Sequence, residues 1–407
     1  MKKIMIASIV CVAALYGAES DIEALKTQMH MQQEVIEKLQ HRVEELERRD
    51  LKKQERELDA RIERAESFSG SFDQSAFLPS ISLVADMSVL GRNVGNEAYE
   101  NYEIPGFLSN PGEIPFNPKR GFNLNYGELG ISATVGPYFD VDSAFHIEKD
   151  GLHIGELYVT TRTLPYHLRM KAGKFKSEFG VINAKHQHAW NFTNIPLVFE
   201  TFFGPGGLGD EGMQMQWVAP TENYLMAGVE AMQGSNGRSF GDTDKINLWT
   251  GYLKGGADFG ESGTAVAGLT YMRGRNPHGI THIYGGDLTL KTLFGSYSAL
   301  TWQSELLYRD KEGTGDQAGL YTELIYDYNQ QWAGGARYDL LFKNVGDLPE
   351  DLDRYTVMLQ YRPFEFSKLR LQYTYDRSKW IEGDRKDIQE LLLGLTIEAG
   401  SHGAHAF

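Results

Sequence analysis

The pattern of apolar and polar positions changes its period once along the chain. In residues 21–66, apolar side chains such as Leu25, Met29 and Ile36 recur three or four positions apart among Glu, Lys, Arg and Gln. This spacing predicts one long coiled-coil helix. After a linker at 67–76, apolar and polar residues alternate, as in Ile81–Val89, and this period of two predicts half-buried β-strands.

The alternating pattern recurs in about sixteen segments between residues 77 and 407. The connections between them alternate between mostly short turns, such as 136–137, and mostly longer loops, such as 91–120, 274–281 and 310–318. An even strand number with short turns at one end predicts an all-β fold, a transmembrane antiparallel β-barrel of about 16 strands. A soluble β-sandwich or β-helix is the alternative, and strands of about nine to eleven residues with aromatic side chains near their ends favour the barrel.

The N-terminus predicts export. Lys2 and Lys3 precede an apolar stretch at 4–15 and small residues at 17–20, which is the order found in a secretory signal peptide over 1–20. Cys11, the single cysteine of the chain, lies in this segment, so the mature protein has no disulfide and no cysteine nucleophile. The formal net charge of −15 argues against nucleic acid as a partner.

Together these segments predict a domain order: signal peptide 1–20, coiled-coil stem 21–66, linker 67–76 and β-barrel 77–407. Both ends of the barrel fall on its short-turn side, which places the stem in the periplasm and the barrel in the outer membrane of a Gram-negative bacterium, in contact with lipids. A long helix with an apolar stripe needs partners. We therefore expect a homo-oligomer, a parallel trimer through the coiled coil; a lone charged helix is the alternative.

The polar face of the predicted strands carries many charges. Arg or Lys facing lipid at the bilayer midplane would cost roughly 2–4 kcal/mol each, so these side chains are expected inside, where a sixteen-stranded barrel leaves an aqueous channel. The mixed, mildly anionic set predicts a weak cation preference. The expected pore-lining residues are Asp86, Glu128, Asp140, Asp142, Glu156, Arg162, Arg169, Lys171, Glu305, Arg337, Asp339, Arg354, Arg362, Arg370 and Asp376.

The third long loop, 176–211, is too rich in aromatic residues for a disordered segment. We expect it to fold into the lumen and narrow it, with Glu178 and Glu200 at the narrowest point; a lid over the outer mouth is the alternative. The expected constriction residues are Glu178, His186, His188, Trp190, Glu200 and Phe202.

Closely spaced histidine pairs in the sequence are candidate metal ligands. A closed zinc site needs about four ligands, and no Asp or Glu follows any histidine pair at a recognisable spacing. We therefore predict neither a metal nor a cofactor; His186, His188, His402 and His405 are the candidates if one binds. No catalytic residue is expected, because the G-x-S-x-G match at 237–241 lies in a polar loop without the strand-to-helix elbow.

Several local stretches resemble bacterial outer-membrane porins. They are Gly-Glu-Leu-Gly-Ile at 127–131 with Pro-Tyr-Phe at 137–139, Lys-Ala-Gly-Lys-Phe at 171–175 with Glu-Phe-Gly at 178–180, and the ending His-Gly-Ala-His-Ala-Phe at 402–407. They are similar to the phosphate-selective porin type and to a proteobacterial group called zinc-regulated outer-membrane receptors. The resemblance implies a porin-like barrel over about residues 75–407.

The sequence therefore predicts a porin that passes small hydrophilic solutes or ions through a water-filled lumen, and no enzyme. A zinc or other metal-ion uptake channel is the first alternative. A structural tether, in which the stem binds the cell wall and the barrel only anchors it, is the second. A barrel hydrolase that uses Ser239 is the third.

Overall fold

The computed structural model describes residues 79–400, apart from 113, 149–150, 242–244 and 344–351. The predicted signal peptide, coiled-coil stem and linker lie outside these residues, as do His402, His405 and Phe407. The predictions made for them stay predictions.

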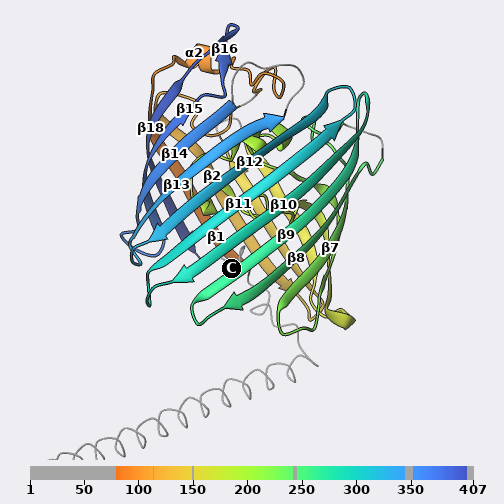
Figure 1. The fold of residues 1–407 in the computed structure, drawn as a ribbon. Coiled ribbons are helices and arrows are strands. Elements are labelled where there is room, and N and C mark those ends of the chain that lie inside the picture. Colours follow the sequence, from red (N-terminus) through yellow and green to blue (C-terminus); the bar gives the residue numbers. More distant parts are fainter. Residues whose placement is uncertain (1–78, 113, 149–150, 242–244, 344–351, 401–407) are drawn as a thin grey trace, which may run out of the picture. The chain divides into compact units, whose positions relative to one another are not determined.

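Sixteen antiparallel strands close into one barrel (Figure 1). Each strand pairs with its neighbours in sequence, and β1 closes the cylinder by pairing with β18, from Ser82 opposite Gly400 to Arg92 opposite Glu390. The predicted strand number is thereby confirmed. The strands are β1 (Ser80–Arg92), β2 (Gly121–Val135), β3 (Phe139–Ile147), β4 (Leu152–Thr161), β5 (Leu168–Lys176), β6 (Gly209–Val218), β7 (Tyr224–Met232), β8 (Leu248–Phe259), β9 (Gly263–Asn276), β10 (Gly279–Leu293), β11 (Ala299–Lys311), β12 (Gly315–Asp327), β13 (Trp332–Lys343), β14 (Leu352–Tyr361), β15 (Ser367–Asp376) and β18 (Ile388–Gly400).

The two-residue period separates the two faces of the wall. On β1, Leu83 and Val89 are exposed on the outer wall, whereas Ser82 and Ser88 on the other face are buried. Because successive strand side chains point to opposite faces, this alternation makes the outer wall apolar and the inner wall largely polar. In the described part of the chain, no helix has the length and apolarity needed to cross a membrane.

The two ends of the barrel differ. At the end that we call the loop end, long segments join β1 to β2 and β5 to β6, and the small elements α2 (Asn96–Tyr99) and β16 (Trp380–Ile381) lie there (Figure 1). β16 pairs with β17 (Asp384–Arg385) in a small separate hairpin that the sequence pattern did not predict. Short turns join the strands at the opposite end.

Two of the loops expected at the loop end are strand instead. β9 ends at Asn276 and β10 begins at Gly279. β11 ends at Lys311 and β12 begins at Gly315, so both connections are tight turns. These strand ends are polar on both faces, for example at Arg275 on the outer face and Asn276 on the inner face, so the alternation that reveals a strand is lost there.

The barrel interior near the loop end holds an apolar core. It is built from residues of four loops, Ile104, Trp190, Phe240 and Ile381 among them, and from inward wall residues such as Met272 and Tyr321. The seven-residue helix α3 (Leu197–Phe203) is buried along its whole length within this core. The loop 177–208, which we call the constriction loop, therefore lies inside the barrel and packs against its wall.

The outer wall provides the first prediction. Leu269 on β9 is 66% exposed there, so Leu269→Arg is expected to lower the free energy of unfolding in lipid vesicles by about 2–4 kcal/mol near the midplane. Thr289→Lys, at an inward position of neighbouring β10, is the matched control and is expected to cost less, because its charge faces the lumen rather than lipid. Equal costs in a urea titration would contradict the assignment of the two faces.

Candidate functional site in the barrel interior

Buried ion pairs attach the second half of the constriction loop to the wall. Arg354 on β14 lies 3.2 Å from Asp339 on β13 and 3.3 Å from Glu200 in α3, and it donates a 2.5 Å hydrogen bond to the Ile195 carbonyl. Arg337 lies 3.0 Å from the same Asp339 carboxylate. Charges removed from water need close partners, so these contacts hold the loop in one place.

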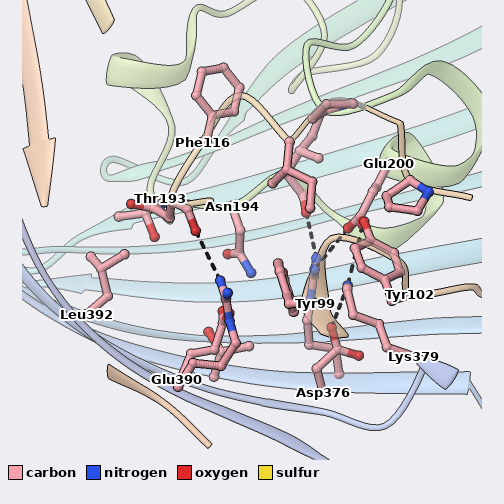
Figure 2. A pocket seen from close by; sticks show the side chains of 18 of the residues that line it. Tyr99, Tyr102, Phe116, Thr193, Asn194, Glu200, Asp376, Lys379, Glu390 and Leu392 are labelled. Atoms are coloured by element: carbon pink, nitrogen blue, oxygen red, sulfur yellow. Dashed lines mark hydrogen bonds and ion pairs between the residues drawn. The ribbon is translucent and has the colours of Figure 1, made fainter. Parts of the chain in front are cut away.

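Glu200 is the centre of this network (Figure 2). Lys379 lies 3.4 Å from Glu200 and 2.9 Å from Asp376, and the Tyr102 hydroxyl donates a 2.5 Å hydrogen bond to Glu200. Burial opposes ionisation of Glu200, but Lys379 and Arg354 outweigh it and hold the pKa of Glu200 below its ordinary value. Burial likewise opposes the charge of Lys379, and Asp376 and Glu200 raise its pKa well above the usual range.

Wall carboxylates bind backbone amides at the start of the constriction loop. Glu305 on β11 accepts hydrogen bonds from the amides of Val181 and Ile182, at 3.1 and 2.9 Å. The chain turns there at Gly180, whose φ is +61° and where a Cβ would collide with Glu305. Glu230 on β7 accepts bonds from the amide of Glu178 and the hydroxyl of Ser177. The buried carboxylates therefore replace the water that these amides would otherwise bind.

A histidine cluster attaches the middle of the loop to β2, β3 and β4. His186 Nδ1 lies 2.7 Å from Glu128, and its Nε2 lies 2.7 Å from Glu156. Burial disfavours the imidazolium, but the hydrogen bonds to Glu128 and Glu156 outweigh it and raise the pKa of His186 to about 9. His188 lies next to it, with Nδ1 3.1 Å from the Tyr126 hydroxyl.

Three cavities lie beside the loops, and neighbouring cavities share lining residues. One of about 370 Å³ lies near the first loop, residues 93–120, and shares Pro111 and Arg238 with a cavity of about 70 Å³. Figure 2 shows the latter, which also shares Phe116 with a third cavity of about 260 Å³ beside the histidine cluster. Charged and amide side chains line part of each cavity, beside apolar side chains.

The predicted pore-lining residues divide into two groups. Those nearer the short turns pair along the wall or face the open lumen: Asp140 lies 3.5 Å from Arg162, and Arg362 lies 3.3 Å from Asp327. Others contact the loops or neighbouring side chains. Lys171 lies 3.0 Å from Glu178 of the constriction loop, and Arg370 donates a hydrogen bond to the Trp190 carbonyl of the same loop. Asp86 accepts a hydrogen bond from Asn125, and Asp142 accepts one from Ser132. Arg169 on β5 belongs to neither group and is exposed.

The constriction residues lie deeper than expected. Glu200 is buried in ion pairs and Glu178 pairs with Lys171, so neither stands alone at a narrowest point. Phe202 is fully buried under the Arg309 guanidinium, at 4.1 Å. The loop was expected to fold into the lumen, and its aromatic side chains pack together there and exclude water locally.

Some contributors were missed from the sequence. The first loop supplies Tyr102 and Ile104 to the interior, and its aromatic residues at 99 and 102 were the available signal. His146 lies 3.5 Å from Glu128, and its inward position on a predicted strand was visible. The Ser239 hydroxyl donates a hydrogen bond to the Phe202 carbonyl and accepts one from Arg309, so it joins the loop between β7 and β8 to α3.

This architecture is the porin fold. The chain is similar to the anion-selective porin from Comamonas acidovorans (TM-score 0.55, 11% identity, 79% of this chain and 100% of that chain) and to the outer-membrane channel DcaP of Acinetobacter baumannii (TM-score 0.51, 12% identity, 82% and 99%). OmpF of Salmonella typhi is also similar (TM-score 0.53, 7% identity, 81% and 99%). At such identities the likeness shows the fold alone.

No family model matches the sequence. A protein of Aquifex aeolicus (strain VF5) described as an uncharacterized protein is 39% identical over 383 residues, which cover 83% of this chain and 81% of that protein. The chain belongs to the same family as this protein. The phosphate-selective and zinc-regulated groups suggested by the sequence remain finer interpretations of the porin fold.

The network around Glu200 provides the second prediction. Glu200→Gln leaves Arg354 and Lys379 without one partner, and breaking a buried pair costs about 3–5 kcal/mol. Amide hydrogen exchange in 197–203 should therefore accelerate about a hundredfold or more. Because the pKa of Glu200 is lowered from 4.5, its ion pairs stabilise the loop above that pH and are lost as the pH falls through the lowered pKa.

Acidification should therefore lower the protection factors of the same amides in the wild type, after correction for the slower intrinsic exchange at low pH, and should have little further effect on them in Glu200→Gln. Glu222→Gln, in the exposed turn after β6, is the matched control. Exchange that is unchanged in Glu200→Gln would show that these ion pairs do not hold α3.

Proposed function

We propose that the protein is an outer-membrane porin that allows passive diffusion of small hydrophilic solutes or ions. The observation that supports this most is the separation of the two faces of one closed barrel, with an apolar outer wall and a charged inner wall. Such a wall suits lipid outside and water inside. The cavities between the loops and the wall supply a narrow route for solutes, and the side chains that line them include charges of both signs.

The route passes Arg238. Its guanidinium donates a 2.6 Å hydrogen bond to the Pro111 carbonyl and lies beside Gly204, so it joins the first loop to the constriction loop between two of the cavities. We expect a solute that enters from the loop end to pass this contact, because Arg238 lines both cavities. Charges of both signs nearby, Lys311 and Glu390, support low selectivity rather than a dedicated binding site, with the weak cation preference expected from the whole inner wall.

The third prediction tests conduction. The purified full chain should form water-filled channels in planar bilayers, and Arg238→Ala should raise the single-channel conductance by roughly 1.5-fold or more because it opens the contact between the loops. Arg162→Ala, at an exposed pair near the short turns, should change it little. A barrel that inserts but does not conduct would overturn the porin proposal and favour the structural tether.

A homo-oligomer is part of this proposal, and a trimer is its expected form. The outer wall near the loop end carries exposed aromatic residues on β8 to β15, such as Trp249, Tyr284 and Tyr355, where a bilayer interface attracts them. On β1 to β6 the corresponding exposed positions are mostly aliphatic, as at Ile147 and Leu152. The strands β3 to β7 have nine or ten residues each, whereas β8 to β13 have 12 to 15. This sector suits contact with another copy better than contact with headgroups.

The fourth prediction follows from this sector. Leu152→Glu should lower the temperature at which the oligomer dissociates in detergent by about 10 °C or more, because a charge enters an apolar interface. Near the bilayer interface, the same charge on a wall that faces lipid would lower the free energy of unfolding by only about 0–1 kcal/mol. Tyr355→Glu, near the same rim on the opposite wall, should leave dissociation unchanged. If both variants behave alike, the oligomer does not form through β1–β6.

A further inference from the structure

Three metal-ligating side chains from distant parts of the sequence meet inside the barrel. Glu128 on β2 and His146 on β3 stand directly opposite each other in the strand register, on the inner face. His186 reaches them from the constriction loop. One ligand atom of each lies within 4.8 Å of the other two.

The distances suit one small ion. His146 Nε2 lies 3.5 Å, and His186 Nδ1 2.7 Å, from the same Oε2 atom of Glu128. Bonds of 2.0–2.1 Å to a tetrahedral zinc ion separate two ligand atoms by about 3.3 Å. His186 Nδ1 and Glu128 would have to move apart by about 0.6 Å, and the two imidazole nitrogens, which lie within 4.8 Å of each other, would have to adopt the same separation.

A second carboxylate orients the loop histidine. Glu156 on β4 lies 2.7 Å from His186 Nε2, and its other oxygen accepts the Lys176 amide at 2.6 Å. A histidine that binds a metal through one nitrogen commonly donates the other N–H to a carboxylate, which fixes the ring and the tautomer. In this tautomer the Nδ1 lone pair faces Glu128 and His146.

The backbone makes room for the remaining ligand. A β-bulge interrupts the pairing of β3 and β4 between Ala144 and Phe145, and Gly155 lies across from it. A Cβ at Gly155 would stand 2.8 Å from His146 Nε2 and 3.0 Å from the Ala144 carbonyl. The wall therefore leaves space for the imidazole where a larger residue would displace its ligand nitrogen.

We propose that Glu128, His146 and His186 bind a divalent transition-metal ion of the zinc class. Two imidazoles and one carboxylate favour such an ion over Mg²⁺ or Ca²⁺, which prefer oxygen ligands. The fourth position faces the cavity of about 260 Å³, so water or a passing solute completes the coordination. On binding, the metal takes the place of the proton on His186 Nδ1, and that proton is released.

Binding would also tie the constriction loop to the wall. The hydrogen bond between His186 and Glu128 is replaced by two metal bonds, and His146 joins them. The inference goes beyond passive diffusion, because it assigns the lumen a specific ligand. A pore that conducts without binding metal would contradict this inference alone.

The test measures equilibrium binding of Zn²⁺ to the full chain in detergent by calorimetry, with Co²⁺ as a visible-absorption probe of nitrogen ligation. The wild type should show one tight site per chain and a four-coordinate Co²⁺ spectrum. His146→Gln, whose ring is not needed to hold the loop, should weaken that site at least about tenfold. Gly155→Ala should do the same by displacing His146 Nε2, and Glu156→Gln should weaken it by about 10- to 100-fold.

Two controls identify the ligands. His282→Gln removes a histidine of β10 that bonds to Tyr271 instead, and should leave binding unchanged. A His402→Gln, His405→Gln double variant should also retain the tight site. Equal binding in the wild type and His146→Gln, loss of the site in the double variant, or no Zn²⁺ binding at all would overturn the inference and leave His186 as an imidazolium bridge between two carboxylates.

Discussion

The interior of this barrel depends on one constraint: a polar group removed from water must find a partner. The constriction loop brings backbone amides and apolar side chains against a wall that carries both charged and apolar side chains. Wherever the loop excludes water, the wall supplies a carboxylate or guanidinium, as Glu305 does for two amides and Arg354 for a carbonyl. Without these partners each buried group would cost about 1–3 kcal/mol, and more if charged. The loop could not then remain inside.

The charged side chains of the inner wall therefore have two roles along the barrel. Near the short turns its charges lie close to open water, as at Asp140 and Arg162. Near the loop end they bind the inserted loops, as at Arg337 and Asp339. A charged inner face is thus evidence of water along only part of the barrel, and the route that we propose for solutes is the space that the loops leave free.

The closed barrel could be predicted from the sequence because strand alternation is a local property. Ile81–Val89 and Leu391–Ile397 show it without reference to any partner, and they pair in the structure. The tight connection at 277–278 was missed because the polar strand ends beside it, beyond the apolar band, lose that alternation. The inward parity of Glu128 and Arg354 was equally visible. Their partners were not, because Glu128 meets His186 across 58 positions and Arg354 meets Glu200 across 154.

This limit is clearest for the histidines. Sequence spacing groups His186 with His188, two positions away, and finds no carboxylate near them. In the structure the ligand atoms that converge come from β2, β3 and the loop, and His188 bonds instead to Tyr126. Strand pairing places Glu128 opposite His146, but only the inserted loop adds His186, so the cluster is a property of the tertiary fold.

The attachments of the constriction loop differ along its length. The second half is held by guanidinium–carboxylate pairs, which keep their charge over the whole physiological range because Arg does not deprotonate. The middle is held by an imidazole between two carboxylates, and imidazole is a side chain that binds metals. Both attachments contact the same wall through buried side chains. The segment around His186 is therefore where the chemistry of the lumen can change how firmly the loop is held, while α3 remains in place.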